Sequence, residues 1–371
     1  MDFDIKIPVR VISVKDSHKN NAFMLKGFGK KCVIVTGGKS ALLSGALDDV
    51  KFALKECDIK YEIYDKIGPN PRIDHCHEAG EIARKFGAEF IVGIGGGSPL
   101  DAAKAVAVYA TNPTFSAEDI FNFGENERNK ALPLVLVGTT AGTGSEVGRV
   151  SVLTNPDTGR KRSIAPDDCF PTLTFADSKY TCSVPYSVTV STALDAMAHA
   201  VESMFSPRAD FLTQKFALIA TEMIYPILEK LSKGEDLPTE EDRNTLYFAS
   251  LYAGFALNKG GTGFPHGMGY ALTEDYNVPH GLACAVFLPA YLKEAENKNP
   301  ALYNELLKSM NATSEKLEKM IQNFCDFDFT IPQDKINEYE IRWENLKNFK
   351  NSPTEFNNKD AARLMTDLFV K

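Results

Sequence analysis

The chain has 371 residues, more than a single hydrophobic core usually supports, so we expect two domains. Hydrophobic residues make up 44% and charged residues 24%, a balance typical of globular proteins and not of coiled coils or disordered chains. The net charge of -8 argues against nucleic acid or an anionic membrane surface as a partner.

Cysteine usage and the N-terminal residues bear on the cellular compartment. The seven cysteines form no CxxC pair, and no apolar run is long enough to span a bilayer. Asp2 and Asp4 are acidic where a signal peptide would carry basic residues. We therefore expect reduced thiols and a cytoplasmic protein that has no membrane partner.

The first half of the chain alternates short β-branched runs with longer amphipathic runs. The apolar pattern predicts strands over residues 31–36, 61–64, 89–94 and 133–137, with helices over residues 44–56, 76–86 and 98–109. This alternation predicts a Rossmann-like parallel sheet with helices on both faces. Ligands of such sheets bind beyond the carboxyl ends of the strands.

The second half carries helical periodicity and few β-rich runs. Helices are predicted over residues 191–205, 211–231, 240–257 and 283–296. We place the domain boundary just before Pro185, with an α/β domain at 1–183 and an all-helical domain at 184–371.

A run of three glycines follows the third predicted strand and opens a helix. Glycine lets the backbone approach an anion closely, and the helix N-terminus adds partial positive charge. Ser98 and Asp101 have the spacing of a capping box, so a well-capped helix after a tight turn would account for these two residues without a ligand. The glycines themselves favour a diphosphate site formed by Gly95, Gly96, Gly97 and Ser98.

A second loop of small residues follows the strand predicted at 133–137. Its sequence, TTAGTGSE over residues 139–146, is a weak signal alone because such loops are common. Hydroxyls such as those of Thr139, Thr140 and Thr143 would face the same crevice as the glycine run. Together the two loops predict a nucleotide site.

The segment LDAMAHA places a carboxylate and an imidazole on one helix face. Asp195 and His199 are four residues apart, and their neighbours are apolar, so the pair requires a hydrogen-bonding partner or a metal. Glu202 lies on the same side and is placed to support a ligand from behind.

Two further histidines share a Pro-His-Gly context, which indicates two shaped backbone positions. His266 and His280 would complete a set of one carboxylate and three imidazoles, which suits Fe²⁺ or Zn²⁺. The alternative is a buried Asp195–His199 hydrogen bond with two unrelated turn histidines, and spacing alone leaves it open.

Four motifs resemble the signatures of the iron-containing, or group III, alcohol dehydrogenases, in the family's order and spacing. They are GGGSPLDAAKA (95–105), TTAGTGSEV (139–147), DAMAHAVES (195–203) and the paired PHG (265–267 and 279–281). The resemblance implies an N-terminal dinucleotide domain and an all-helical C-terminal domain, in a dehydroquinate synthase-like architecture. It implies metal ligands at Asp195, His199, His266 and His280, a diphosphate loop at 95–98, and further cofactor contacts at Asp101, Thr139, Thr143 and Lys161.

Two departures from the family pattern bear on chemistry. Tyr270 stands where many members carry a further histidine, which puts a histidine proton relay in doubt because tyrosine titrates much higher. NAD-preferring members tend to have Asp after the first strand, but here Gly37 is followed by Gly38, Lys39 and Ser40. The missing carboxylate and the nearby lysine favour NADP(H) over NAD(H), unless this segment is only a solvated turn.

The resemblance implies reversible, metal-dependent hydride transfer between NAD(P)H and a short-chain aldehyde, primary alcohol or diol. It also implies a homodimer or a higher homo-oligomer. The alternatives are a metal- and NAD-using lyase of the dehydroquinate synthase type, a glycerol dehydrogenase-like polyol oxidoreductase, and a non-catalytic nucleotide-binding relative. The lyase would need several lysines and arginines for an anionic substrate, whereas the largely apolar residues 255–270 contain only Lys259.

Overall fold

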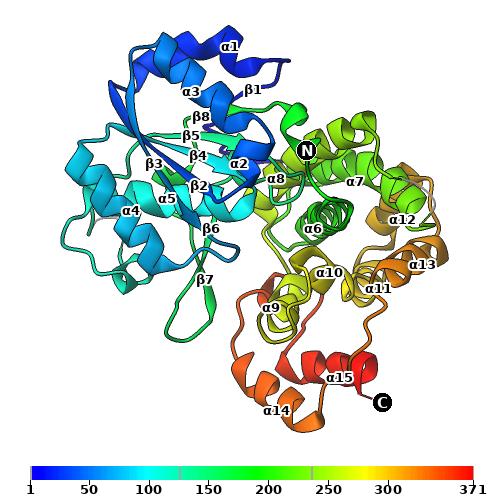
Figure 1. Cartoon of the computed structure of the whole chain (residues 1–371). Helices are drawn as coiled ribbons and strands as arrows, with labels where there is room; N and C mark the ends of the chain where they lie inside the picture. The colour runs from blue at the N-terminus through cyan, green and yellow to red at the C-terminus, as the bar shows by residue number, and fades with distance from the viewer. Residues whose placement is uncertain (1, 125–126, 235–236, 371) are drawn as a thin grey trace. The chain divides into compact units, whose positions relative to one another are not determined.

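The computed structural model describes residues 2–124, 127–234 and 237–370 (Figure 1). The chain folds into two compact units. One is an α/β unit of residues 6–185, and the other is a helical unit in which the described residues of 1–5 join those of 186–371. The sequence did not predict that the N-terminal residues belong with the helices.

A six-stranded parallel sheet forms the centre of the α/β unit, in the order β1-β8-β5-β4-β2-β3. The predicted parallel sheet is therefore confirmed. The strands are β1 (Arg10–Ile12), β2 (Lys31–Gly37), β3 (Lys60–Ile67), β4 (Phe90–Gly95), β5 (Leu134–Gly138) and β8 (Leu173–Phe175). The sequence missed β1 and β8, because three residues are too few to show a period.

Helices cover both faces of this sheet. They are α1 (Ser17–Asn21), α2 (Ser40–Leu43), α3 (Ala46–Glu56), α4 (Ile73–Phe86) and α5 (Gly97–Thr111). On β2, Val33 and Val35 pack with α4 and α5, whereas Cys32 and Ile34 pack with α3. Burial on both faces explains why the central strands read as continuous apolar runs.

Shorter elements complete the α/β unit. An antiparallel pair, β6 (Ser151–Thr154) and β7 (Lys161–Ile164), lies outside the main sheet. The 3-10 helices are η1 (Ala22–Gly27), η2 (Glu118–Phe121), η3 (Ser145–Val147), η4 (Asp167–Cys169) and η5 (Ser178–Thr181).

The strand order places a topological switch between β2 and β4. The chain proceeds from β2 to β3 on one side, and then to β4, β5 and β8 on the other. Ligands of such sheets bind at the carboxyl ends of the strands beside the switch. Gly37 ends β2 and Gly95 ends β4, so the predicted cofactor loops begin at this point.

The helical unit contains ten α-helices and one 3-10 helix within the described residues. They are α6 (Tyr186–Met204), α7 (Phe211–Leu231), α8 (Glu240–Gly260), α9 (Phe264–Tyr276), α10 (His280–Ala285), α11 (Leu288–Lys298), α12 (Pro300–Met310), α13 (Ser314–Phe324), α14 (Gln333–Arg342), η6 (Phe349–Asn351) and α15 (Asn358–Phe369). Side-chain caps begin two of the longest, with Asp210 at α7 and a Thr239–Asp242 capping box at α8. Among the residues that the structure describes, none of the helices combines the length and the apolar character of a membrane span.

Three local predictions are corrected by the structure. The single helix predicted over 283–296 is two helices, α10 and α11, because Pro289 has no amide hydrogen and its ring would clash with the Ala285 carbonyl. The helix predicted over 44–56 begins at residue 46, after Gly45 at φ 80°. The capping box of Ser98 and Asp101 is wrong, since α5 begins at Gly97 without a side-chain cap.

His18 in α1 is buried in the α/β unit and is held in its neutral form. The Tyr180 hydroxyl donates to Asp49 at 2.9 Å, so the His18 Nδ1–H donates in turn to the Tyr180 oxygen at 2.9 Å. The Nε2 atom of His18 has no hydrogen-bonding partner among the described residues. Burial therefore lowers the pKa of His18 to about 3.

We expect this histidine to make the protein less stable in mild acid. Its pKa is lower in the folded than in the unfolded chain, so the unfolded chain binds the extra proton between about pH 6.5 and pH 3. The free energy of unfolding should fall by about 2 kcal/mol from pH 7 to pH 5 through this group alone. His18→Gln should lose that part of the slope in urea titrations at the two pH values. An unchanged slope would contradict the neutral assignment.

Candidate functional site

Helix α6 presents three acidic or imidazole side chains on one buried face. Asp195, His199 and Glu202 are 4%, 7% and 0% exposed, respectively, and follow one another at helical spacing. The surrounding alanines and Met197 are also buried, so this face lies in the core of the helical unit.

Glu202 fixes the position and tautomer of His266 at the start of α9. Its Oε1 lies 2.5 Å from His266 Nδ1, while its Oε2 accepts from the backbone amides of Gly263 and His266 at 2.7 and 3.3 Å. A carboxylate that accepts two amide bonds serves as the acceptor for the Nδ1 proton as well. His266 is thereby left with the Nε2 lone pair facing away from Glu202.

A glycine brings the third histidine against α6. His280 is the first residue of α10, and Gly281 follows it. A Cβ atom at Gly281 would lie 1.7 Å from the Ser191 carbonyl oxygen and 2.9 Å from the Asp195 amide nitrogen. Only glycine permits this approach of α10 to α6, which gives the second Pro-His-Gly segment a physical reason.

The nitrogen atoms of the three histidines converge on one oxygen of Asp195. Asp195 Oδ1 lies 3.3 Å from His266 Nε2, and 3.9 Å from the Nε2 atoms of both His199 and His280. The His199 and His266 rings stack at 4.5 Å, and the His280 ring stacks on Tyr270 at 5.4 Å. The structure thus brings together all four sequence-predicted ligands, with Tyr270 beside them.

Cys284 also belongs to this cluster, and sequence reasoning missed it. Donor atoms of Asp195, His266, His280 and Cys284 all lie within 4.8 Å of one another. The only signal in the sequence is its spacing of four residues from His280, which repeats the spacing of Asp195 and His199. We call these five residues, with His199 included, the Asp195 cluster.

The Asp195 cluster has the donor set and the unpaired atoms that a divalent cation fits. Asp195 Oδ1 and His266 Nε2 are buried, and neither has a hydrogen-bonding partner among the described residues. Two lone pairs that face one another at 3.3 Å are unfavourable unless a positive charge lies between or beside them. Donor atoms around a tetrahedral zinc ion are about 3.4–3.8 Å apart, close to the spacings here.

Electrostatics in the cluster favour positive charge. Burial alone would lower the pKa of His266, but the acidic neighbours Cys284, Glu202 and Asp195 raise it well above its usual value. Burial alone would raise the pKa of Asp195, but His199, His266 and His280 hold it well below its usual range. Burial raises the pKa of the Cys284 thiol to about 11.

In the α/β unit, the glycine run of residues 95–97 packs directly against the loop of residues 139–146, which we call the threonine loop. Gly95 ends β4 at φ 149°. A Cβ at Gly97 would lie 2.5 Å from Thr143 Cγ2, and one at Gly96 would lie 3.0 Å from Thr140 Oγ1. The amide of Thr139 donates to the Gly95 carbonyl at 2.9 Å. The two predicted cofactor loops are therefore neighbours.

One hydroxyl at this junction lacks a partner. Thr139 is 1% exposed, and its Oγ1 has no hydrogen-bonding partner among the described residues. The hydroxyl of Ser98 accepts from the Asn70 amide at 3.2 Å. Glycines that admit no side chain, together with an unpaired hydroxyl, fit a cradle for a polar ligand such as a diphosphate.

A buried ionic network under the cradle was not predicted. Lys104 is fully buried in α5, and its ammonium donates to Ser145 Oγ at 2.7 Å and to the Val150 carbonyl at 2.8 Å. Asp101 accepts from Ser145 Oγ at 2.6 Å and from the Val152 amide at 2.8 Å. Burial lowers the pKa of Lys104 and raises that of Asp101. The Lys104 ammonium also lies 3.7 Å from Asp101 Oδ1, so the observed contacts of this carboxylate are to the protein, and its predicted contact with cofactor stays a prediction.

The remaining predicted cofactor residues lie on the surface of the α/β unit. Gly38 and Lys39 are exposed between β2 and α2, and Ser40 is exposed as the first residue of α2. Gly37 packs beneath the Ile67 carbonyl. Lys161 is half-buried at the start of β7. Their roles stay predictions.

Two family models together match most of the chain. The iron-containing alcohol dehydrogenase model matches residues 8–178, and the Fe-containing alcohol dehydrogenase C-terminal model matches residues 189–360. The chain belongs to the iron-containing alcohol dehydrogenase family. The resemblance inferred from four motifs is thus confirmed.

Relatives within the iron-containing alcohol dehydrogenase family support the assignment. The chain is 33% identical to a 1,3-propanediol dehydrogenase from Citrobacter freundii over 79% of this chain and 75% of the relative. It is 30% identical to an NADPH-dependent butanol dehydrogenase from Clostridium saccharobutylicum over 86% of this chain and 83% of the relative. An iron-containing alcohol dehydrogenase from Thermotoga maritima has a TM-score of 0.90 at 30% identity, covering 99% of both chains. The predicted dehydroquinate synthase-like architecture is confirmed.

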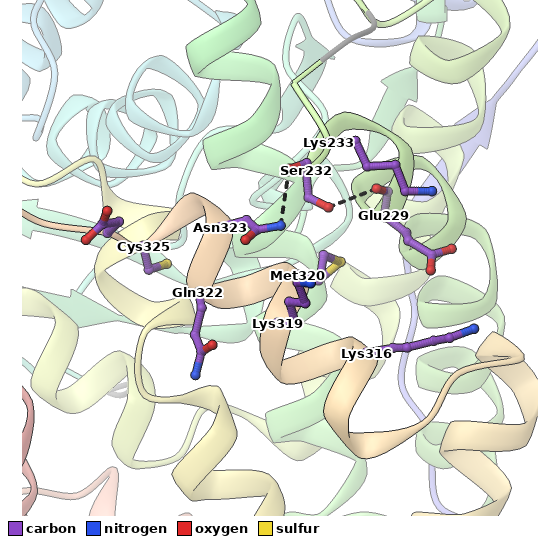
Figure 2. Close-up of a pocket in the computed structure, with 10 residues that line it drawn as sticks. Glu229, Ser232, Lys233, Lys316, Lys319, Met320, Gln322, Asn323 and Cys325 are labelled. Atoms are coloured by element: carbon purple, nitrogen blue, oxygen red, sulfur yellow. Dashed lines mark hydrogen bonds between the residues drawn. The ribbon is translucent and has the colours of Figure 1, made fainter.

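A cavity of about 940 Å³ lies at the C-terminal ends of α7 and α13. Figure 2 shows its lining side chains, which come from the last turn of α7, from α13 and from the residues directly after each helix. Asn323 donates to the Ser232 carbonyl at 3.3 Å across it. Its lysines, Lys233, Lys316 and Lys319, are exposed, and two carboxylates share the lining. None of the residues of the Asp195 cluster lines this cavity, so we assign it no part in the chemistry.

Proposed function

We propose that the protein catalyses reversible hydride transfer between NAD(P)H and a short-chain aldehyde, primary alcohol or diol. The observation that carries the proposal is the convergence of three imidazoles on the unpaired Asp195 oxygen. The relatives named above, which act on propanediol and butanol, support the alcohol class. We further propose that the helical unit holds the metal and the α/β unit the dinucleotide.

Asp195, His199, His266 and His280 would hold Fe²⁺ or Zn²⁺. When bound, such an ion acts as a Lewis acid that lowers the pKa of an alcohol hydroxyl and polarises an aldehyde carbonyl. Glu202 keeps the proton of His266 on Nδ1, so that the lone pair of Nε2 can coordinate the ion. The close approach at Gly281 keeps His280 in reach of Asp195. Among the three imidazoles His280 is the most exposed, with 30% of its side chain accessible, so its side of the cluster is open for substrate.

The two loops beyond β4 and β5 would bind the dinucleotide. Gly95, Gly96, Gly97 and Ser98 would contact the diphosphate, with Thr139, Thr140 and Thr143 beside them. Asp101 and Lys161 would make further contacts with the dinucleotide. The exposed Lys39 and Ser40, and the absence of a carboxylate at Gly37, support NADP(H) over NAD(H) because a 2′-phosphate is anionic.

Tyr270 would pass a proton between the reacting oxygen and solvent. Its ring lies parallel to that of His280, with an interplanar angle of 11°, so it is beside the open side of the cluster. We also propose that the protein works in the cytoplasm as a homodimer or a higher homo-oligomer.

The decisive experiment is a reductase assay with metal-depleted protein. Protein reconstituted with Fe²⁺ or Zn²⁺ is mixed with NADPH or NADH and a panel of short aldehydes, and loss of reduced nicotinamide absorbance is followed. We expect metal-dependent oxidation, faster with NADPH. Metal-loaded protein that oxidises neither cofactor would overturn the proposal and favour the lyase alternative, which recycles its cofactor without net change.

A further inference from the structure

The thiol of Cys284 is the one donor in the Asp195 cluster to which the proposed function gives no task. Its Sγ lies 3.8 Å from both ring nitrogens of His280. It also lies within 4.8 Å of the donor atoms of Asp195 and His266. Cys284 and His280 are four residues apart on α10, as Asp195 and His199 are on α6, so each helix contributes a pair from one face.

Two other thiols in the described chain, those of the buried Cys57 and the half-buried Cys325, have a different environment. Cys57 donates to the Ala22 carbonyl at 3.0 Å, and Cys325 donates to the Leu282 carbonyl at 3.6 Å. The Cys284 thiol instead lies against an imidazole and near a buried carboxylate oxygen that has no hydrogen-bonding partner among the described residues. A cysteine that served only to fill space would not need to point at these atoms.

Local packing holds the sulfur in place. Cys284 is fully buried, and a Cβ atom at Gly269 on α9 would lie 2.9 Å from its Sγ. The thiol therefore occupies the space that the missing side chain of Gly269 leaves between α9 and α10. This contact restricts the sulfur to the side of α10 on which His280 lies.

We infer that Cys284 is an additional, sulfur donor to the ion held by Asp195 and the three histidines. The inference rests on the proposed metal site and adds to it a soft ligand. On coordination the metal–sulfur bond forms as the S–H bond breaks heterolytically, and the proton leaves to solvent without any change of oxidation state. Thiolate is a soft donor, so it favours Zn²⁺ and Co²⁺ over Mn²⁺ more than a site of oxygen and nitrogen alone.

The absorption spectrum of bound Co²⁺ shows directly whether sulfur coordinates the ion, and the measurement does not depend on enzyme activity. Metal-depleted full-length protein is titrated with Co²⁺, and bound metal is measured by elemental analysis. We expect the wild-type protein to show a near-ultraviolet sulfur-to-cobalt charge-transfer band besides the visible bands of the ion. Cys284→Ser should bind Co²⁺ and lose the charge-transfer band. Cys284→Ala replaces it if the serine variant does not fold.

The matched control is Cys325→Ser, which removes a neighbouring thiol bonded to the backbone of α10 and should keep the band. In competition titrations, Cys284→Ser should weaken Zn²⁺ binding at least about tenfold and Mn²⁺ binding less than about threefold. Equal losses for both ions would show a general disturbance and would overturn the inference.

The outcomes separate this inference from the proposed function. Wild-type protein that binds Co²⁺ without a charge-transfer band leaves the metal site standing and overturns the role of Cys284. Wild-type protein that binds no Co²⁺ overturns both. A band that survives in Cys284→Ser, or in Cys284→Ala, also overturns the assignment to this residue.

Discussion

Replacing His266 by alanine should abolish metal binding and turnover together. His266 is 2% exposed, and its two nitrogens lie between the carboxylates of Glu202 and Asp195, at 2.5 and 3.3 Å. Its loss removes a ligand and leaves two buried carboxylates facing a cavity. Replacing a residue that only supports a metal ligand typically lowers metal affinity or activity 10–100-fold. Because we propose His266 as a ligand itself, we expect its replacement to lower kcat/KM by more than about 100-fold.

The measurement is metal content by elemental analysis, together with kcat/KM at saturating cofactor. His75→Ala is the matched control, because it removes a histidine from α4 in the α/β unit and should leave both quantities unchanged. Circular dichroism checks that His266→Ala folds. A folded His266→Ala variant that retains stoichiometric metal and turnover would remove His266 from the ligand set.

The fold could be predicted where the sequence of an element shows by itself which of its faces are buried. Strands such as residues 31–37 are apolar throughout because helices cover both faces, and the alternation with helices then requires a parallel sheet. Strands β1 and β8 could not be predicted, because they are defined by pairing across distant parts of the chain. The break between α10 and α11 was predictable in principle, since Pro289 stands in the middle of the helix expected there.

The candidate site could be predicted in part for the same reason. The Asp195–His199 spacing is a property of one helix, and the two Pro-His-Gly segments are local patterns. Cys284 was missed because its place depends on how α10 packs against α6 and α9, through Gly281 and Gly269. Lys104 was missed because a lysine on an amphipathic helix ordinarily lies in solvent, and only the loop at Ser145 makes its burial favourable.

Replacing Lys104 by methionine should destabilise the protein by about 3–5 kcal/mol, as expected when one partner of a buried ion pair is removed. Methionine fits the volume but leaves Asp101, the Val150 carbonyl and Ser145 without the ammonium. Asp101→Asn in the same chain removes the uncompensated charge, so the double variant should regain more than half of the loss. Urea denaturation of the full-length proteins measures both effects.

Cofactor binding distinguishes a role in stability from a role in positioning. Ser145 belongs to the threonine loop, and its hydroxyl donates to Asp101 while it accepts from Lys104. Without the hydrogen bond from the Lys104 ammonium to Ser145, the cofactor itself must order the loop when it binds. This ordering makes the free energy of cofactor binding less favourable by at least about 1.4 kcal/mol, which raises Kd about tenfold. The double variant, which regains more than half of the lost stability, should therefore still bind NADPH about tenfold more weakly by fluorescence titration than Asp101→Asn alone, which lacks the same proposed cofactor contact. Equal affinities of the double variant and Asp101→Asn would show that the loop keeps its shape without Lys104, and would confine the network to a role in stability.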